Sequence, residues 1–373
     1  MAQKLYEESN IQAIANAIRG KNGLTTTYKV SEMAAAITAI EGGGSTPIEP
    51  PVGDGKTRIY IHLEDGRTSP MLGICPKGTV TVDWGDGTES NTLTGTSVTT
   101  VKWTPTHNYA AVGDYVISLT VDGVAGLYGI DGTNEYSCLL RYSSGADIRN
   151  RVYQNAIRKI EIGNGITSIS SYAFKNCYAL ESIIIPNTVS SISDFAFAFC
   201  HSLSNVSLSN GITSIGYNVF QGCQSLLNIS LPNSITSIAD SLFYNCVPLS
   251  TVSLPNNITS ISNYMFSGCY SLPKIEIPDT VTSIGDNAFY YCYSLSNITI
   301  PHGVTNIGAY AFGYCQGMKY YDFTALSAVP TLSKANAFTG IAADCEIRVP
   351  AALADEWKAA TNWATYANKI VGV

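Results

Sequence analysis

Charged residues are scarce in this chain. They make up 13% of its 373 residues, about half the share of an average globular protein, and the net charge is −7. Proteins that bind nucleic acid gather Lys and Arg on one face, whereas residues 166–327 hold three lysines and no arginine. We therefore expect no nucleic-acid partner.

Long hydrophobic runs are also missing. No apolar run reaches the roughly 18 residues of a membrane-spanning helix, and the start M-A-Q-K-L-Y-E-E-S-N has no apolar signal region. We therefore expect no membrane insertion. Abundant Gly, Ser, Asn, Thr and Tyr are nevertheless typical of an extracellular or virion surface. A phage virion protein would satisfy both observations, because lysis releases it from the cell.

Residues that catalysis commonly uses are sparse. The four histidines, His62, His107, His201 and His302, lie far apart in the sequence. The nucleophile motif G-x-S-x-G, the zinc motif H-E-x-x-H and a phosphate-binding glycine loop do not occur. The seven acidic residues of 166–327 show no pairing typical of glycan cleavage. We predict a protein that is not an enzyme, without catalytic residues, metal or cofactor.

What the chain does contain is a repeat with a period of 23 residues, which is typical of a solenoid. Three apolar positions recur in seven consecutive copies. They are an isoleucine (Ile169, Ile192, Ile215, Ile238, Ile261, Ile284, Ile307), a phenylalanine (Phe174, Phe197, Phe220, Phe243, Phe266, Phe289, Phe312) and a cysteine (Cys177, Cys200, Cys223, Cys246, Cys269, Cys292, Cys315).

Six of the copies also carry the L-x-x-L-x-L spacing of leucine-rich repeats, as in Leu180-x-x-Ile183-x-Ile185, whereas the seventh has Met318, Tyr321 and Phe323 at these positions. The alternating part of this spacing predicts a short strand, which a proline such as Pro186 then ends, because proline cannot donate to a strand ladder. The Phe and Cys three residues apart suit one turn of an α- or 3₁₀-helix facing the interior. One copy buries too little to fold alone, so stacked copies must share a core.

The segment I-T-S-I-G-D-N-A-F-Y-Y-C-Y-S-L-S-N-I-T-I-P at 281–301, with Val281 for the first Ile, resembles the BspA-like, or treponema-type, leucine-rich repeat family. The resemblance covers 166–327 and implies a solenoid of about seven repeats of 23 residues. Such repeats are common in surface adhesins and host-binding proteins. Residues 328–373 resemble a degenerate repeat followed by the family's C-terminal helical cap, expected as one amphipathic helix over 351–370.

The ladder cysteines are best explained as small buried core residues. Disulfides between neighbouring coils and a metal site are the less favoured alternatives, since C-x-x-C spacing is absent. Three further cysteines, Cys75, Cys138 and Cys345, lie outside the ladder and cannot be paired from the sequence.

Residues 57–124 alternate in the manner of short strands separated by turns, which predicts a β-sandwich. The motifs W-G-D-G-T at 84–88 and H-x-Y at 107–109, followed by G-x-Y at 113–115, resemble the PKD domain, an immunoglobulin-like sandwich of surface proteins. Asp83, Asp86 and His107 could suggest an acid–base or Ca²⁺ site. We favour a structural role, in which Asp86 bonds its own turn and His107 packs near Trp84. Residues 125–165 then form a connector and the N-terminal solenoid cap.

The N-terminal part predicts a helical hairpin over 1–41 and a Gly/Pro-rich linker over 42–56. The stretch I-A-N-A-I-R-G-K-N-G-L-T-T-T-Y-K-V-S-E-M-A-A-A-I resembles a helical module at the start of many phage tail-associated proteins. The resemblance implies attachment to other virion proteins or to sister chains, with a trimer as the homo-oligomer to test. A plain solvent-facing hairpin is the alternative.

Thirteen tyrosines lie in 166–327, many where the core does not require them. Since equivalent positions of a solenoid stack, the tyrosines flanking the ladder residues are expected to form an aromatic stripe suited to sugar or protein recognition. The candidate binding residues are Tyr178, Tyr244, Tyr270, Tyr290, Tyr291, Tyr293 and Tyr314. The alternative is that tyrosines merely shield the flank of the solenoid.

The strand face offers a second candidate surface. It presents small polar side chains: Ser207, Ser230, Ser253, Thr299, Asn205, Asn228, Thr251 and Asn297. Such a face could accept an extended glycan or simply be solvated.

Together these features predict a mainly β, multidomain phage virion surface protein of the tail tip, fibre or baseplate. It would bind a glycan or protein of the bacterial host through its repeats and be extracellular after lysis. The alternatives are a bacterial cell-surface adhesin and a structural decoration protein without a receptor.

Overall fold

The computed structural model describes residues 54–64, 68–99, 102, 104–130, 138–142 and 155–373. The predicted helical hairpin over 1–41 and nearly all of the linker over 42–56 lie outside the described residues. Gly55–Val373 forms one compact unit that is mainly β, with few helices. No helix of the described part is long and apolar enough to cross a membrane.

The first strands of this unit form an antiparallel sheet in the order β4, β3, β5, β1. Their bounds are β1 (Thr57–Leu63), β3 (Ile74–Asp83), β4 (Asn91–Thr96) and β5 (Gly113–Leu127). Ile59, Ile61 and Leu63 alternate toward the core and are buried. A separate two-stranded sheet joins β2 (Pro70–Leu72) to β6 (Leu140–Tyr142). The immunoglobulin-like, PKD-type arrangement itself stays a prediction.

This sheet continues directly into the repeats. Strand β1 pairs antiparallel with β7 (Ile157–Glu161), placing Ile59 opposite Ile160. Strand β5 runs to Leu127, past the predicted boundary at residue 124, and pairs with β8 (Ile166–Ile169). The two regions also share one hydrophobic core. Residues 57–127 therefore close the N-terminal end of the solenoid.

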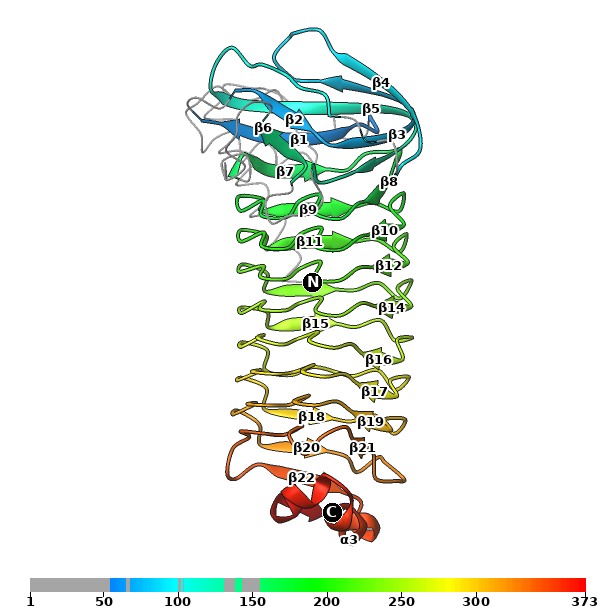
Figure 1. The fold of residues 1–373 in the computed structure, drawn as a ribbon, viewed down its shortest axis with the longest axis vertical. Coiled ribbons are helices and arrows are strands. Elements are labelled where there is room, and N and C mark those ends of the chain that lie inside the picture. The colour runs from blue at the N-terminus through cyan, green and yellow to red at the C-terminus, as the bar shows by residue number, and fades with distance from the viewer. Residues whose placement is uncertain (1–53, 65–67, 100–101, 103, 131–137, 143–154) are drawn as a thin grey trace, which may run out of the picture. The chain divides into compact units, whose positions relative to one another are not determined.

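The repeats build a solenoid of about nine turns, two more than the seven copies that the sequence predicted. The extra turns come from residues at either end, around Ile160 and Ile347, whose strands stack in register with the others. One face carries β7, β9 (Ser182–Ile185), β11 (Asn205–Leu208), β13 (Asn228–Ser230), β15 (Thr251–Ser253), β18 (Asn297–Thr299), β20 (Tyr320–Asp322), β22 (Glu346–Val349) and β23 (Ile370–Gly372) (Figure 1).

The second face carries shorter strands, each containing the ladder isoleucine or its equivalent. They are β8, β10 (Ser191–Ile192), β12 (Ser214–Ile215), β14 (Ser237–Ile238), β16 (Ser260–Ile261), β17 (Ser283–Ile284), β19 (Asn306–Ile307) and β21 (Thr331–Leu332). The pairing within this face is parallel, and Ile192 lies opposite both Ile169 and Ile215. Each coil therefore places its isoleucine directly over the previous one.

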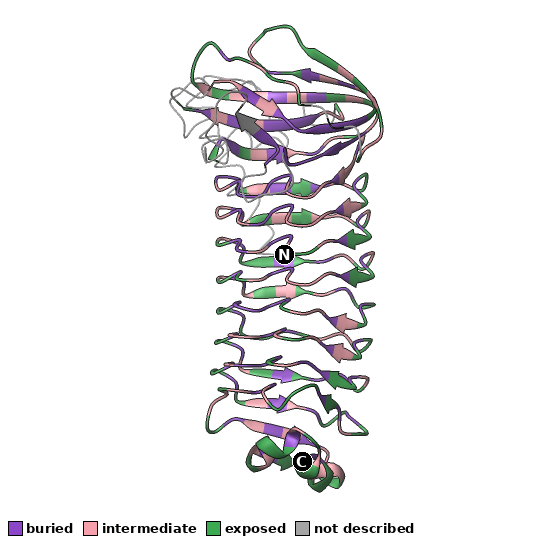
Figure 2. Cartoon of the chain, viewed as in Figure 1, coloured by how far each residue is buried: buried purple, intermediate pink, exposed green. Residues whose placement is uncertain are grey.

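The predicted core residues are buried, and buried positions recur in each coil (Figure 2). The phenylalanine rings from Phe174 to Phe312, and then Phe338, follow one another at centroid distances of 5.1 to 5.9 Å. All seven ladder cysteines have no exposed surface. They are free thiols.

Between its phenylalanine and its cysteine each coil makes a single hydrogen-bonded turn. The N–H of Cys177, for example, donates to the carbonyl of Phe174 at 3.1 Å. The turn does not extend into a helix, because the residue before the cysteine has a left-handed backbone conformation in every coil.

The C-terminal cap differs from the single helix expected over 351–370. Three short pieces replace it: η2 (Ala351–Leu353), α3 (Ala354–Ala359) and η3 (Trp363–Lys369). The helix α3 ends before Ala360, whose backbone is extended, and η3 begins after Asn362, whose φ of 67° is left-handed. The break lets Trp357 and Trp363 both reach the interior, where Trp363 Nε1 donates to the Pro330 carbonyl at 2.7 Å.

Candidate functional site

Two positions of every coil from Phe174 to Phe312 have a left-handed backbone, with φ between 53 and 77°. One is two residues before the phenylalanine: Tyr172, Phe195, Asn218, Ser241, Tyr264, Asn287 and Tyr310. The other directly precedes the cysteine: Asn176, Phe199, Gly222, Asn245, Gly268, Tyr291 and Tyr314. Glycine and asparagine adopt this conformation most readily. The aromatic residues among them do not follow that preference.

A side chain other than Gly or Asn pays about 1 kcal/mol or more in a left-handed conformation. Asn245 and Gly268 show that the coil accepts the favourable residues at the same place where Tyr291 and Tyr314 stand. The tyrosines are therefore not needed to form the turn. Strain that the turn does not require is typical of functional surfaces.

Six tyrosines from three successive coils make one connected group, which we call the tyrosine cluster: Tyr270, Tyr290, Tyr291, Tyr293, Tyr310 and Tyr314. Ring centroids lie 5.0 Å apart for Tyr270 and Tyr293, and 5.5 Å for Tyr293 and Tyr291. Tyr291 contacts Tyr290 at 4.1 Å and Tyr314 at 5.0 Å. Tyr290 meets Tyr310 edge to face at 5.8 Å.

Two glycines make room for these rings. A Cβ atom at Gly313 would lie 2.9 Å from Cδ2 of Tyr290, and one at Gly340 would lie 2.5 Å from Cδ1 of Tyr314. Both contacts are too short for a real Cβ atom. The backbone of the next coil thus passes directly beneath the rings and supports them from below.

The tyrosine cluster is partly exposed and uncharged. Tyr270, Tyr293 and Tyr310 are 36 to 39% exposed, and the other three members are half-buried. A hydrogen bond with Tyr291, together with desolvation, raises the pKa of Tyr290, so its hydroxyl stays neutral over the physiological range. The cluster offers ring faces and phenol hydroxyls, a chemistry for contact with a partner and not for acid–base catalysis.

The structure brings together five of the seven predicted binding residues. Tyr244 instead packs edge to face on Tyr264, at 6.3 Å. Tyr178 lies in the first coils, where its ring stacks on His201 at 4.6 Å. Tyr310 belongs to the tyrosine cluster but was not among the predicted residues. Its position two residues before Phe312 repeats with the period and could have identified it.

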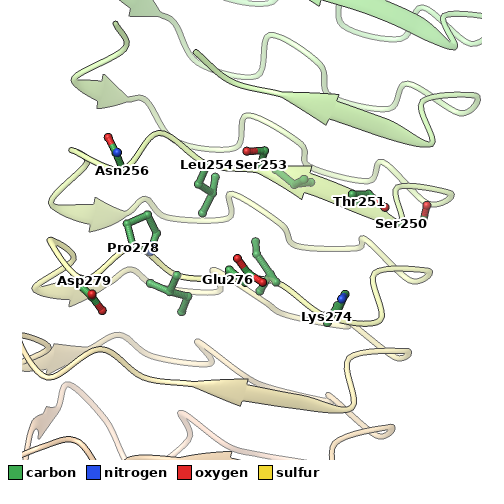
Figure 3. A pocket seen from close by; sticks show the side chains of 12 residues that line it. Ser250, Thr251, Ser253, Leu254, Asn256, Lys274, Glu276, Pro278 and Asp279 are labelled. Carbon is green, nitrogen blue, oxygen red and sulfur yellow. The ribbon is translucent and has the colours of Figure 1, made fainter. Parts of the chain in front are cut away.

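The strand face, the second predicted surface, has a shallow cleft of about 610 Å³ between β15 and residues 274–279. Figure 3 shows Thr251, Ser253 and Asn256 along one side, with Lys274 and Glu276 along the other. Pro273 explains why the sheet is interrupted here. The equivalent Ser250 and Ser296 donate their N–H groups to the preceding coil, whereas proline has none to donate.

We rank this cleft below the tyrosine cluster as a recognition site. It arises from a lost strand hydrogen bond, and its polar residues lie mostly exposed to solvent. No backbone strain like that of the tyrosine cluster is found in residues 250–256 or 272–279.

Asp83, Asp86 and His107 make turn and packing contacts. Asp83 accepts the Gly85 N–H at 2.9 Å, and Asp86 accepts the backbone and hydroxyl of Thr88. His107 Nε2 lies 2.7 Å from Asp86 Oδ2, and the imidazole stacks on Trp84 at 5.0 Å. Burial alone would raise the pKa of Asp86, but the Thr88 and His107 hydrogen bonds outweigh it and lower the pKa.

Within the described ranges, no three or more His, Cys, Asp or Glu side chains are placed so that they could hold a metal ion.

Sequence comparison identifies six copies of the BspA type leucine-rich repeat region, matching residues 146–272 and 236–341. These matches span more than half of the chain. The search of curated proteins gave no match.

Several solved leucine-rich repeat structures resemble the chain. A protein from Bacteroides ovatus is 24% identical, with a TM-score of 0.45, over 57% of this chain and 59% of its own. A protein from Eubacterium ventriosum is 22% identical, with a TM-score of 0.34, over 62% of this chain and 73% of its own. The Treponema pallidum leucine-rich repeat protein is 24% identical, with a TM-score of 0.31, over 46% of this chain and 65% of its own. The chain thus spans less than two thirds of the length of the first and third of these relatives.

Proposed function

We propose that this chain, which belongs to the BspA-type leucine-rich repeat family, is a non-enzymatic phage virion surface protein that binds the bacterial host through its solenoid. Leucine-rich repeat solenoids are generally non-enzymatic binding proteins. The proposal goes further by naming the tyrosine cluster as the contact surface and a host glycan or protein as its partner.

The observation that carries the proposal is the combination of strain and clustering. Tyr291, Tyr310 and Tyr314 occupy left-handed positions at a cost that asparagine or glycine would avoid. Their rings nevertheless meet on one surface, over glycines that fit beneath them. Tyrosines give a large contact area with little loss of conformational freedom, so a rigid group of six is well suited to recognition.

The virion location rests on the sequence resemblance of residues 14–37 to helical modules of phage tail-associated proteins. Such a module would fix the chain to the particle and leave the solenoid free to meet the host. Mass spectrometry of purified phage particles should find the chain as a stoichiometric component. If the chain is found in the bacterial cell envelope instead, the adhesin alternative replaces the virion assignment.

Binding is tested with the full chain, fluorescently labelled, on cells of the strain that the phage infects. We expect saturable binding that blocks phage adsorption. Replacing both Tyr270 and Tyr293 with serine should weaken binding at least about 30-fold, since one hot-spot tyrosine alone contributes about 2 kcal/mol. Both side chains are exposed, so the fold should be retained.

The matched control replaces Ser230 and Thr299 on the strand face with alanine. These residues are also exposed, and their loss should leave binding unchanged. The opposite pattern, with binding lost in the strand-face variant alone, would move the site to that face. No binding by any form of the chain would favour the decoration alternative.

A further inference from the structure

The first cysteine of the ladder has a different sulfur contact from the other six. In each later coil the thiol donates to the carbonyl of the phenylalanine in the preceding coil, at 2.9 to 3.3 Å. Cys200, for example, bonds Phe174. For Cys177, the structure gives instead a contact to the sulfur of Cys138, at 3.0 Å.

Cys138 holds this place because its segment fills the position that a preceding coil would occupy. The N–H of Leu139 donates to the Ala173 carbonyl at 2.5 Å, and the Leu139 carbonyl accepts the Gly73 N–H at 2.9 Å. Both sulfurs are shielded from solvent, with Cys138 1% and Cys177 0% exposed. The pair therefore lies where the residues just before β6, Gly73 just after β2 and the first repeat coil meet.

We propose that Cys138 and Cys177 form a disulfide when the chain folds in the presence of a low-molecular-weight disulfide. A protein S–S bond is about 2.05 Å long, so the sulfurs need to approach by only about 1 Å. The proposal concerns covalent closure of the solenoid's N-terminal end and does not depend on the recognition function.

The reaction is a thiol–disulfide exchange in two steps. The Cys138 thiolate attacks the small disulfide, forms a mixed disulfide and releases one small thiol. The Cys177 thiolate then attacks the Cys138 sulfur and releases the second small thiol. Two electrons pass from the two cysteines to the small disulfide, and the two cysteine protons end on the released thiols.

The environment favours Cys138 as the first nucleophile. The hydrogen bond from Cys177 lowers the pKa of Cys138, whereas burial raises that of Cys177. Strand β6 is only three residues long and pairs with the equally short β2, so this segment can open for the small disulfide more easily than the ladder itself.

The test refolds the full chain with oxidised glutathione, alkylates free thiols under denaturing conditions and maps peptides without reduction. We expect one linked pair, Cys138–Cys177, a mass lower by two hydrogens, and alkylation of the other eight cysteines. The oxidised protein should melt several degrees higher than the reduced one, because the link restricts the unfolded chain.

Variants sharpen the assignment. Cys138→Ser should abolish the link, whereas Cys200→Ser, which removes an equally buried ladder thiol, should keep it. Peptide mapping of the unaltered chain decides the matter even if a variant fails to fold. Alkylation of all ten cysteines after oxidation, or a link between Cys177 and Cys200, would overturn the proposal.

Discussion

A chain that begins at residue 128 is expected to form no stable soluble monomer. Its first strands would lose their partners, since β7 pairs with β1 and β8 pairs with β5. Ile157, Ile160, Ile166 and Ile169, all buried in the complete unit, would lie at an open end. Exposing four isoleucines costs about 8 kcal/mol at about 2 kcal/mol each, comparable with the whole stability of a domain.

The matched control is the chain from residue 55 to 373, which keeps the compact unit whole. It should elute as a single species in size-exclusion chromatography with light scattering and unfold in a cooperative transition. The shorter chain should aggregate, as solenoids do without their caps. If it remains monomeric and melts at the same temperature, the sheet over 57–127 is not a cap.

Stability should fall steeply above pH 9, because the ladder thiols cannot ionise in the folded state. Burial raises the pKa of Cys246 and of Cys315 from the ordinary 9.0 to about 12. Above pH 9 the unfolded chain loses these protons while the folded chain keeps them. Each thiol therefore lowers the free energy of unfolding by about 1.4 kcal/mol per pH unit, until the pH reaches its folded pKa.

This contribution is complete below pH 9 and is lost between pH 9 and about 12, and burial shifts the other ladder thiols in the same direction. Urea unfolding at pH 8, 9.5 and 10.5 measures the slope. Replacing Cys246 and Cys315 with alanine should reduce it by about 3 kcal/mol per pH unit. An equal slope in the variant would show that the thiols are not the cause.

The period of the sequence was sufficient to predict the interior. Ile238, Phe243 and Cys246 were assigned to the core from their spacing alone, and all three are buried. In a solenoid each coil repeats the environment of the last, so a position that is always apolar must face inward. The same reasoning identified most members of the tyrosine cluster as outward-facing residues.

Two features could not be read from the period. The period places the tyrosines on one flank but not the orientation of their rings, so it could not show which of them meet, as Tyr291 and Tyr314 do at 5.0 Å. The continuity of β5 with β8 and the contact of Cys138 with Cys177 are non-local. Neither has a repeat or a short spacing that would reveal it.

We propose that the tyrosines at the left-handed positions are kept for binding and not for the fold. The most direct test of this role is the affinity of a chain carrying both Tyr291→Asn and Tyr314→Asn for host cells. Asparagine accepts the left-handed backbone, so the relief of strain should offset the lost ring contacts. The free energy of unfolding of the variant should therefore stay within about 1 kcal/mol of that of the unaltered chain. We predict that affinity falls by roughly 30-fold or more. Unchanged affinity in this folded variant would contradict the claim.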